Sequence, residues 1–165
     1  MRRLPKVVGE GWQLGGILSL QTGQPFSVLT GQGLSGTGLG NDRPDLIGDP
    51  NAGPHTVAKW FNTDAFVLNQ PRTFGNAGRN IVTGPGYHNF DFSVLKNTHI
   101  GEHVNAQFRA EFFNITNHPN FALPSNVLAA PNFGELFQTP DAAQNNVGLG
   151  SGGPRLIQFA LKLSF

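Results

Sequence analysis

The stretch that decides the fold class is residues 155–165, RLIQFALKLSF, because its side chains alternate between apolar and polar along almost its whole length. One parity is apolar and the other is mostly polar, with Ile157, Phe159, Leu161, Leu163 and Phe165 opposite Gln158, Ala160, Lys162 and Ser164. Successive side chains of a β-strand point to opposite faces of the sheet. The stretch therefore predicts a strand with one apolar face and one mostly polar face.

Three further stretches show the same alternation. Residues 104–113 place Val104, Ala106, Phe108, Ala110 and Phe112 opposite Asn105, Gln107, Arg109 and Glu111, and residues 88–96 place Phe90, Phe92 and Val94 opposite Asn89, Asp91 and Ser93. Residues 11–22 place Trp12, Leu14, Leu18 and Leu20 opposite Gln13, Ser19 and Gln21, with Ile17 and glycines weakening the contrast. The sequence predicts an all-β fold of about four antiparallel amphipathic strands, at 11–22, 88–97, 103–114 and 155–165.

The connections between these strands are unequal. The link at residues 97–103 is short and contains Gly101, which predicts a tight hairpin turn. The links at 31–87 and 115–154 are long and rich in Gly, Asn, Pro and Asp. Compact soluble domains rarely carry two connections of this length without regular structure of their own. We expect long loops there, with one small helix at residues 56–61.

The composition excludes several classes of protein. The 165 residues include 22 Gly and 12 Pro, which disfavours a helical bundle. The glycines have no three-residue period, so the chain is not collagen-like. The absence of cysteine excludes a disulfide scaffold and a cysteine-based zinc site. A net charge of +1 argues against nucleic acid as a partner.

Membrane signals in the sequence are of one kind only. No stretch of ~18 apolar residues is present, so we expect no transmembrane helix. The basic start, residues 1–6, is followed by an apolar stretch that Gly9, Glu10 and Gln13 interrupt, so we expect no secretory signal within the chain. Transmembrane β-strands remain possible, because their signal is an alternation over ~10 residues.

Two folds explain the alternation from the residues alone. A soluble β-sandwich alternates in the same way. A transmembrane barrel has short periplasmic turns and long extracellular loops, and the chain matches that order if its last strand ends at the periplasm. The charges in the predicted strands (Asp91, Arg109, Glu111 and Lys162) suit a water-filled lumen or the outer surface of a sandwich equally well.

Seven strings of sequence carry a resemblance to a known family. They are GWQLGGILSLQTGQPFSV (11–28), NDRPDLIGDP (41–50), WFNTDAF (60–66), FGNAGRN (74–80), GPGYHNFDFSVLKN (84–97), FRAEFFNITNHPNF (108–121) and IQFALKLSF (157–165). In this order and spacing the chain resembles the C-terminal part of the barrel of TonB-dependent outer-membrane receptors, specifically the Oar-like, carboxypeptidase-regulatory-like group of acidobacteria. The resemblance spans about residues 9–165.

The resemblance implies a larger parent protein. Such receptors have a barrel of about 22 strands around an internal plug, and an N-terminal segment that contacts the TonB energy-coupling protein. About four strands are too few to close a transmembrane barrel, so we expect residues 1–165 to be a C-terminal fragment. The implied function is TonB-coupled uptake of a bulky nutrient, a saccharide or a siderophore, at the outer membrane. The implied partners are outer-membrane lipid, the rest of the barrel and plug, the barrel-assembly machinery and, through N-terminal parts, the TonB complex.

The resemblance also implies roles for particular residues. The last strand would carry the barrel-assembly signal, formed by Phe159, Leu161, Leu163 and Phe165. The polar residues Asp91, Arg109, Glu111 and Lys162 would face the lumen. Three aromatic residues would belong to the girdles at the membrane interfaces or to a core: Trp12, Phe90 and Phe112. Four loop residues would contact ligand or pack the loops together: Trp60, Phe61, Phe66 and Phe74.

Catalytic and metal sites are not expected. The five histidines are His55, His88, His99, His103 and His118, and the pair at 99 and 103 flanks a turn that gives it no common face. Asp42, Asp45 and Asp49 could offer oxygens to calcium, but their spacing is not that of an EF-hand and the neighbouring prolines suggest turns. There is no cysteine nucleophile and no G-x-S-x-G elbow.

Three further sequence patterns are weak indications of a functional site. Asp91 and Glu111 could form an acid–base pair, although lumen lining explains them as well. The glycines at 31–33 and 148–153 do not follow a strand and open a helix, as a nucleotide-binding loop requires. Residues 114–116 fit a glycosylation acceptor. We expect no enzymatic activity and no cofactor.

Overall fold

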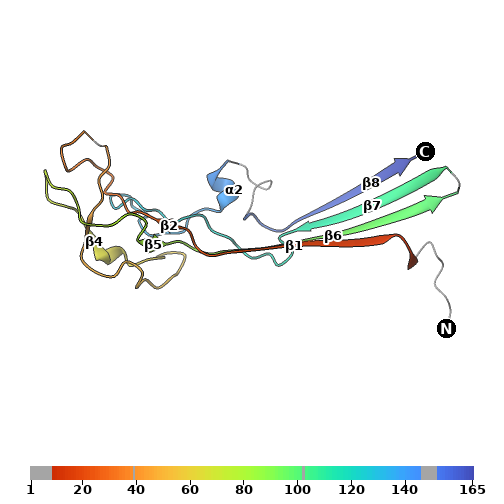
Figure 1. Ribbon diagram of the computed structural model, residues 1–165, viewed down its shortest axis with the longest axis horizontal. Coiled ribbons are helices and arrows are strands. Elements are labelled where there is room, and N and C mark those ends of the chain that lie inside the picture. The colour runs from red at the N-terminus through yellow and green to blue at the C-terminus, as the bar shows by residue number, and fades with distance from the viewer. Residues whose placement is uncertain (1–8, 39, 102, 146–151) are drawn as a thin grey trace.

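The protein has an elongated shape, with a sheet of long strands at one end and a folded body of loops at the other (Figure 1). The computed structural model describes residues 9–38, 40–101, 103–145 and 152–165. The long sheet has the order β1 (Trp12–Gln21), β6 (Tyr87–Ile100), β7 (Val104–Phe113) and β8 (Leu156–Ser164), with every neighbouring pair antiparallel. The predicted all-β class and the antiparallel sheet of four strands are confirmed.

The register of the sheet places the alternating apolar residues of all four strands on the same side. Directly paired residues form rows across all four strands, namely Trp12–Lys96–Phe108–Leu161, Leu14–Val94–Ala110–Phe159 and Gly16–Phe92–Phe112–Ile157. Since the side-chain period of a strand is two, this register gives the sheet an apolar face and, opposite it, a polar face. The side of the long sheet with these apolar rows is its apolar face, and the opposite side is its polar face.

The hairpin between β6 and β7 is tighter than predicted. The expected link ran from 97 to 103, but Asn97, Thr98 and His99 pair with residues of β7, so the ladder continues to Ile100. The turn keeps Gly101, whose φ of 69° lies in the left-handed region that glycine adopts without a Cβ clash. The sheet is open within the described residues, with β1 and β8 as its edges.

In the part of the chain that the structure describes, no helix is long and apolar enough to cross a membrane.

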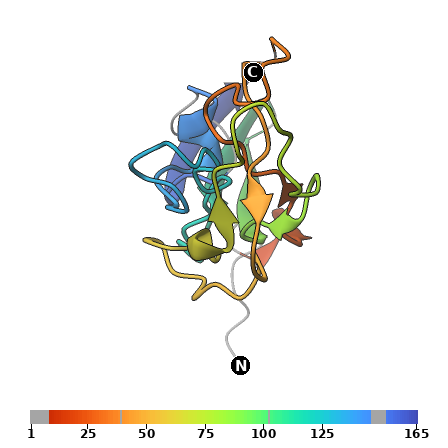
Figure 2. The same cartoon turned by 90° about the vertical axis from the view of Figure 1, so that its left-hand side faces the viewer.

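The long connections fold together into a second unit, which we call the loop body (residues 25–83 and 120–138). Two small antiparallel pairs organise it: β2 (Pro25–Phe26) with β5 (Val82–Thr83), and β3 (Asp45–Leu46) with β4 (Phe66–Val67). A single 3₁₀ turn, η1 (Thr63–Ala65), precedes β4. Seen from the loop end, these elements and the coils around them form a rounded body in front of the sheet (Figure 2).

An apolar core holds the loop body together. Its buried members are Phe26, Val28, Phe61, Ala65, Phe66, Ala77 and Val82, with Leu46, Trp60, Ile81, Leu128 and Phe133 packed against them. The ring of Phe61 lies edge-on to those of Phe26, Phe66 and Phe133, at centroid distances of 5.6, 5.9 and 5.2 Å. Aromatic pairs in this geometry stabilise a core beyond their buried area. The two long connections are therefore one packed unit.

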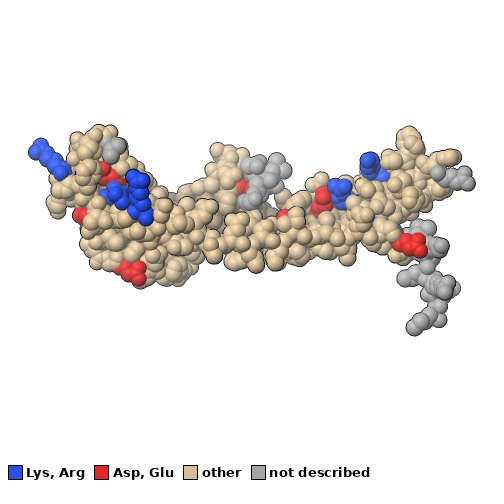
Figure 3. Space-filling model, in the orientation of Figure 1, with Lys and Arg blue, Asp and Glu red and all other residues tan. Residues whose placement is uncertain are grey.

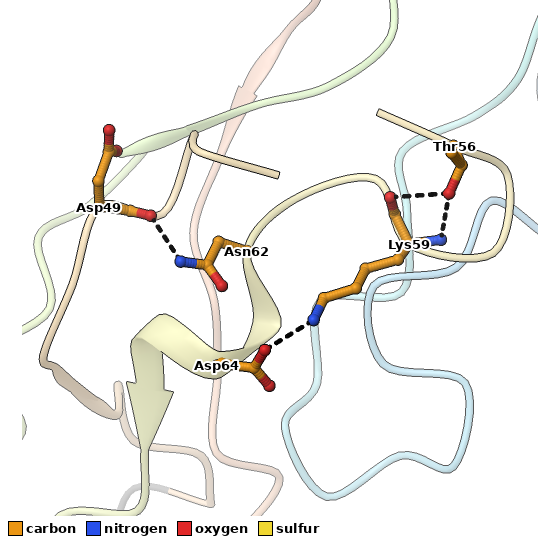
Figure 4. A network of polar contacts seen from close by, with 5 residues as sticks. All are labelled: Asp49, Thr56, Lys59, Asn62 and Asp64. Atoms are coloured by element: carbon orange, nitrogen blue, oxygen red, sulfur yellow. Dashed lines mark hydrogen bonds and ion pairs between the residues drawn. The ribbon is translucent and has the colours of Figure 1, made fainter. Parts of the chain in front are cut away.

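The helix predicted at residues 56–61 is wrong. Thr56 and Lys59 close a short turn through their backbones and the Thr56 hydroxyl, and the Trp60 amide donates to the carbonyl of Gly134 in the other connection. The amides thus bond to a neighbouring loop where a helix would use its own preceding turn. Figure 4 shows this turn beside an ion pair between Lys59 and Asp64, at 2.8 Å. It also shows a hydrogen bond from the Asn62 side-chain amide to the Asp49 carbonyl, at 3.1 Å.

Candidate functional site

The apolar face of the long sheet is exposed rather than covered. Leu14 is 70% exposed, Phe159 65% and Leu161 67%. Such fractions argue against a sandwich formed within the described residues, because a sandwich buries this face under a second sheet. A continuous exposed apolar face of this kind requires an apolar surrounding or a partner.

The polar face carries the titratable residues that the sequence singled out. Asp91, Arg109, Glu111 and Lys162 all have the parity that the register places opposite the apolar face. Three of these residues have polar partners. Arg109 and Glu111 form an ion pair at 3.6 Å, and Asp91 Oδ1 accepts hydrogen bonds from the Asn89 side chain and the Asn114 backbone amide, both at 2.9 Å. The face is not uniformly polar, since Ile17 and Leu95 share it.

Aromatic rings are distributed over the apolar face. Phe108 stacks on Phe159 with centroids 6.0 Å apart, and Phe92 lies 6.4 Å from Phe112. Trp12 lies near the hairpin end, with the Lys96 ammonium 5.1 Å from its ring centroid. Together these rings and the aliphatic side chains give the face the character of a surface that contacts hydrocarbon.

The comparison with protein families decides between the remaining classes. Residues 2–158 match the family described as outer membrane beta barrel domain. The chain belongs to this family. No curated protein and no solved structure matches the chain. As a member of the outer membrane beta barrel family, the protein is located in the outer membrane, and the soluble β-sandwich considered from the sequence is wrong.

The charges of this outer-membrane barrel protein lie on both the loop body and the long sheet. In the space-filling view, uncharged residues cover most of the visible surface, and Lys and Arg side chains gather on the loop body at the left (Figure 3). The cations that belong to the loop body are Arg43, Lys59, Arg72 and Arg79. The four long strands carry five charged residues, and all but Lys96 lie on the polar face: Asp91, Lys96, Arg109, Glu111 and Lys162.

The last strand, β8, has all nine of its residues exposed. Phe159, Leu161 and Leu163 continue the apolar face to its end, and Phe165 follows the strand as a fully exposed side chain. The assembly role that the sequence gave to these four residues stays a prediction, which their position on a free strand edge suits.

Of the four aromatic loop residues, three are structural. Phe61 and Phe66 are buried in the core of the loop body, so they pack the loops and do not line a surface. The Trp60 indole donates to the Thr83 carbonyl at 2.9 Å and packs against the same core. Phe74 is 68% exposed and is the one of the four that a ligand could reach.

The loop carboxylates organise turns. Asp42 accepts bonds from the Ser35 amide at 2.6 Å and the Ser35 hydroxyl at 3.0 Å. Asp45 accepts from the Asn76 amide at 3.0 Å, and Asp49 from the amide of Asn51 at 2.9 Å. Because their oxygens hold backbone donors, the three aspartates do not converge on a calcium site.

The histidines are scattered over the fold. His99 lies in β6 and His103 in the following turn, while His55 packs on Trp60 and the rings of His88 and His118 meet at 5.2 Å. Across the described ranges, no three His, Asp or Glu side chains gather where they could hold a metal ion.

Two further sequence patterns do not mark sites. Asn114 of the glycosylation pattern is 5% exposed, and its amide donates to the carbonyls of His118 and Gly153 at 2.9 and 3.0 Å, so a glycosyl group has no access to it. Gly31 lies in a bend, and its amide donates to the Asn41 side chain at 2.7 Å. Gly148 and Gly150 of the second glycine-rich stretch and the basic start at 1–6 lie outside the described residues, while Gly152 and Gly153 lie inside them.

Asn120, which no sequence pattern predicts as important, joins the sheet to the loops. This side chain is 1% exposed; its Oδ1 accepts from the His88 amide and its Nδ2 donates to the His88 carbonyl, both at 2.8 Å. Asn120 thus replaces a backbone partner at the start of β6. No local pattern signals this role, because 32 residues separate the two positions.

A cavity of about 580 Å³ is likewise not predicted by any sequence pattern. It lies where β1 ends, between Tyr87, residues 121–123 and the short helix α2 (Pro140–Ala143). In Figure 1 this helix stands beside the waist that joins the sheet to the loop body. Four distant segments build the cavity, so only the fold brings its lining together.

Proposed function

We propose that this chain forms part of the wall of a TonB-dependent outer-membrane transporter that takes up a bulky nutrient of the saccharide or siderophore class. One observation carries the proposal: a single sheet presents an exposed apolar face on one side and charged residues on the other. A wall between lipid and a wet lumen requires this combination. The resemblance in sequence supplies the class of transporter.

The dimensions of the strands support a transmembrane wall. β1 and β7 each contain 10 residues, and a tilted strand needs about 9–11 residues to cross the hydrocarbon core. In this proposal the apolar face lies against lipid, while Asp91, Arg109, Glu111 and Lys162 face the lumen. Charges on the polar face then stay hydrated, which avoids the cost of burying them in hydrocarbon.

The connections support an orientation. The short turn after β6 lies at the periplasmic side, and the loop body lies outside the cell, as in barrels with short periplasmic turns and long extracellular loops. Further strands complete the barrel, because open edges in lipid leave backbone groups unpaired. The plug inside it is what the resemblance in sequence implies. The barrel-assembly machinery would bind the last strand through Phe159, Leu161, Leu163 and Phe165.

Energised uptake tests this function in cells. Wild-type cells and cells that lack the gene receive labelled malto-oligosaccharides or a ferric siderophore, with and without a protonophore. The proposal expects that at least one of these nutrients accumulates only when both the gene and the proton gradient are present. Accumulation that needs the gene but ignores the protonophore indicates a passive pore and contradicts TonB coupling.

A further inference from the structure

The cavity at the end of β1 opens on the polar face of the sheet. Ser19, Gln21 and Tyr87 contribute to its wall, and all three have the parity of Asp91 and Arg109. Segments 121–123 and 138–144 close it from the side of the loop body. In the proposed barrel this position is the upper end of the lumen, where an incoming ligand passes from the loops to the interior.

The lining of this cavity is neutral and rich in amides. We call it the glutamine cavity, after Gln21, Gln24, Gln138 and Gln144, and hydroxyl groups of Ser19, Thr22 and Tyr87 stand beside these amides. Among the residues that the structure describes, no Lys, Arg, Asp or Glu lines it. Gln21, Gln24 and Gln144 are exposed and Gln138 is half-buried, so an entering ligand can reach the four amides.

Such a lining selects a ligand by its hydrogen-bonding groups. Each amide offers two donors and an acceptor with two lone pairs, and each hydroxyl offers one donor and two lone pairs. Ligand hydroxyl groups match both functions, whereas a charged ligand would enter without a counter-ion and lose its hydration. Phe121 and Leu123 add the apolar surface that binding pockets combine with a few polar groups.

The size of the glutamine cavity suits a ligand larger than a single small metabolite. Its volume of about 580 Å³ lies within the range of about 300–1,000 Å³ for ligand pockets. A second, smaller hollow of about 420 Å³ on the loop body contains Arg43 and Arg79 together with Phe74. The two hollows therefore differ in charge, and the arginine hollow provides an internal control.

We propose that the glutamine cavity binds a neutral saccharide on its path into the barrel. This inference rests on the proposed transport function and narrows its two nutrient classes to the neutral, polyhydroxylated one. Gln138 acts as a binding residue from the loop side and Gln21 from the strand side, so the saccharide bridges the loop body and the sheet. Anionic ferric chelates are excluded from this cavity, because its described lining offers them no cation.

A cysteine reporter tests the proposal in outer-membrane vesicles that contain the protein. The chain has no cysteine, so Ala143→Cys places a single thiol of this chain at the cavity rim without removing an amide. The labelling rate with a membrane-impermeant maleimide is measured with a panel of neutral α- and β-glucans, mannans, galactans and xylans, and with ferric citrate as the anionic probe. At least one neutral glycan slows labelling about tenfold, and ferric citrate does not.

Substitutions then locate the effect. In the reporter background, Gln138→Ala and, separately, Gln21→Ala weaken glycan protection about three- to tenfold, because each removes hydrogen bonds from the bound ligand. Gln70→Ala, an exposed glutamine outside the cavity, and Arg79→Ala, in the arginine hollow, leave protection unchanged. Migration of unheated samples on gels confirms that each variant is folded.

The outcomes separate this inference from the transport proposal. The inference is overturned if no neutral glycan slows labelling, or if protection persists in both glutamine variants. Energised uptake of a ferric chelate without glycan protection refutes the saccharide site and leaves the transporter standing. Glycan protection without energised uptake refutes the transporter and leaves the saccharide site standing.

Discussion

Single polar side chains replace missing backbone partners at the junction of sheet and loops. Asn120 bonds to both backbone groups of His88, Asp91 accepts the Asn114 amide, and Asn114 in turn donates to the Gly153 carbonyl. Buried backbone groups that lack such partners destabilise a fold strongly. These side chains therefore fix where the strands stop and the loops start.

Asn120→Ala tests this role of a side chain. The substitution leaves the amide and carbonyl of His88 without their partner, so we expect the free energy of unfolding to fall by about 2 kcal/mol. Urea titration of the protein in lipid vesicles measures the change. Gln70→Ala serves as the control and should stay within about 0.5 kcal/mol of the wild type. An equal effect in both variants would mean that Asn120 has no special role.

Gly75→Ala tests the packing inside the loop body. A Cβ at this position would meet the carbonyl oxygens of Arg43 and Pro44, which are backbone atoms and cannot move aside cheaply. Overpacking of this kind destabilises by about 1–3 kcal/mol, and we expect faster cleavage of the loop body by protease added to whole cells. A Cβ on Gly40 would meet no atom within 4 Å, so Gly40→Ala should be cleaved at the wild-type rate. Equal cleavage of the two variants would contradict the close packing around Gly75.

At the scale of elements, the strands could be predicted and the loop body could not. Local alternation predicts each long strand. The strand register places Asp91, Arg109, Glu111 and Lys162 on the same face of the sheet. The loop body depends on contacts between distant segments, such as Ser27 with Asn80 and Phe61 with Phe133. Such contacts leave no period in the sequence, and the wrong helix at 56–61 shows the consequence.

The two faces of β8 should respond oppositely to the same charge. Phe159→Arg places a cation on the apolar face, which costs about 2–4 kcal/mol near the bilayer midplane. Gln158→Arg places it on the polar face, where water solvates it, and should change the free energy of unfolding by less than about 0.5 kcal/mol. Unfolding titrations in lipid vesicles measure both. Similar losses in the two variants would contradict the assignment of faces.

The loop body should unfold separately from the sheet when a large core side chain is removed from it. Phe61→Ala removes the ring that contacts three other aromatic rings, and a cavity of this kind costs about 3–5 kcal/mol. We expect protease to cleave residues 25–83 in intact cells while the strands remain protected. Phe74→Ala, at an exposed ring, should leave the cleavage pattern unchanged. Loss of strand protection in Phe61→Ala would show that the two parts fold as one.

At the scale of the whole molecule, one sheet has an apolar and a polar face, and one folded body lies at its end. Alternation in the sequence assigns most strand residues to a face, although Ile17, Leu95 and Lys96 break the pattern. It does not predict the glutamine cavity, since Gln21, Tyr87, Phe121 and Gln138 come together only through the fold. The central claim of the account is that the apolar face contacts lipid and the polar face contacts water.

A cysteine scan of β7 in lipid vesicles tests that claim most directly. Single cysteines at positions 105–112 are probed with a water-soluble maleimide and, after labelling with a fluorophore, with lipids that carry a quencher. We predict a period of two, with lipid quenching at 106, 108, 110 and 112 and aqueous labelling at 105, 107, 109 and 111. Equal aqueous labelling at all positions, or no quenching by lipid at the even ones, would contradict it.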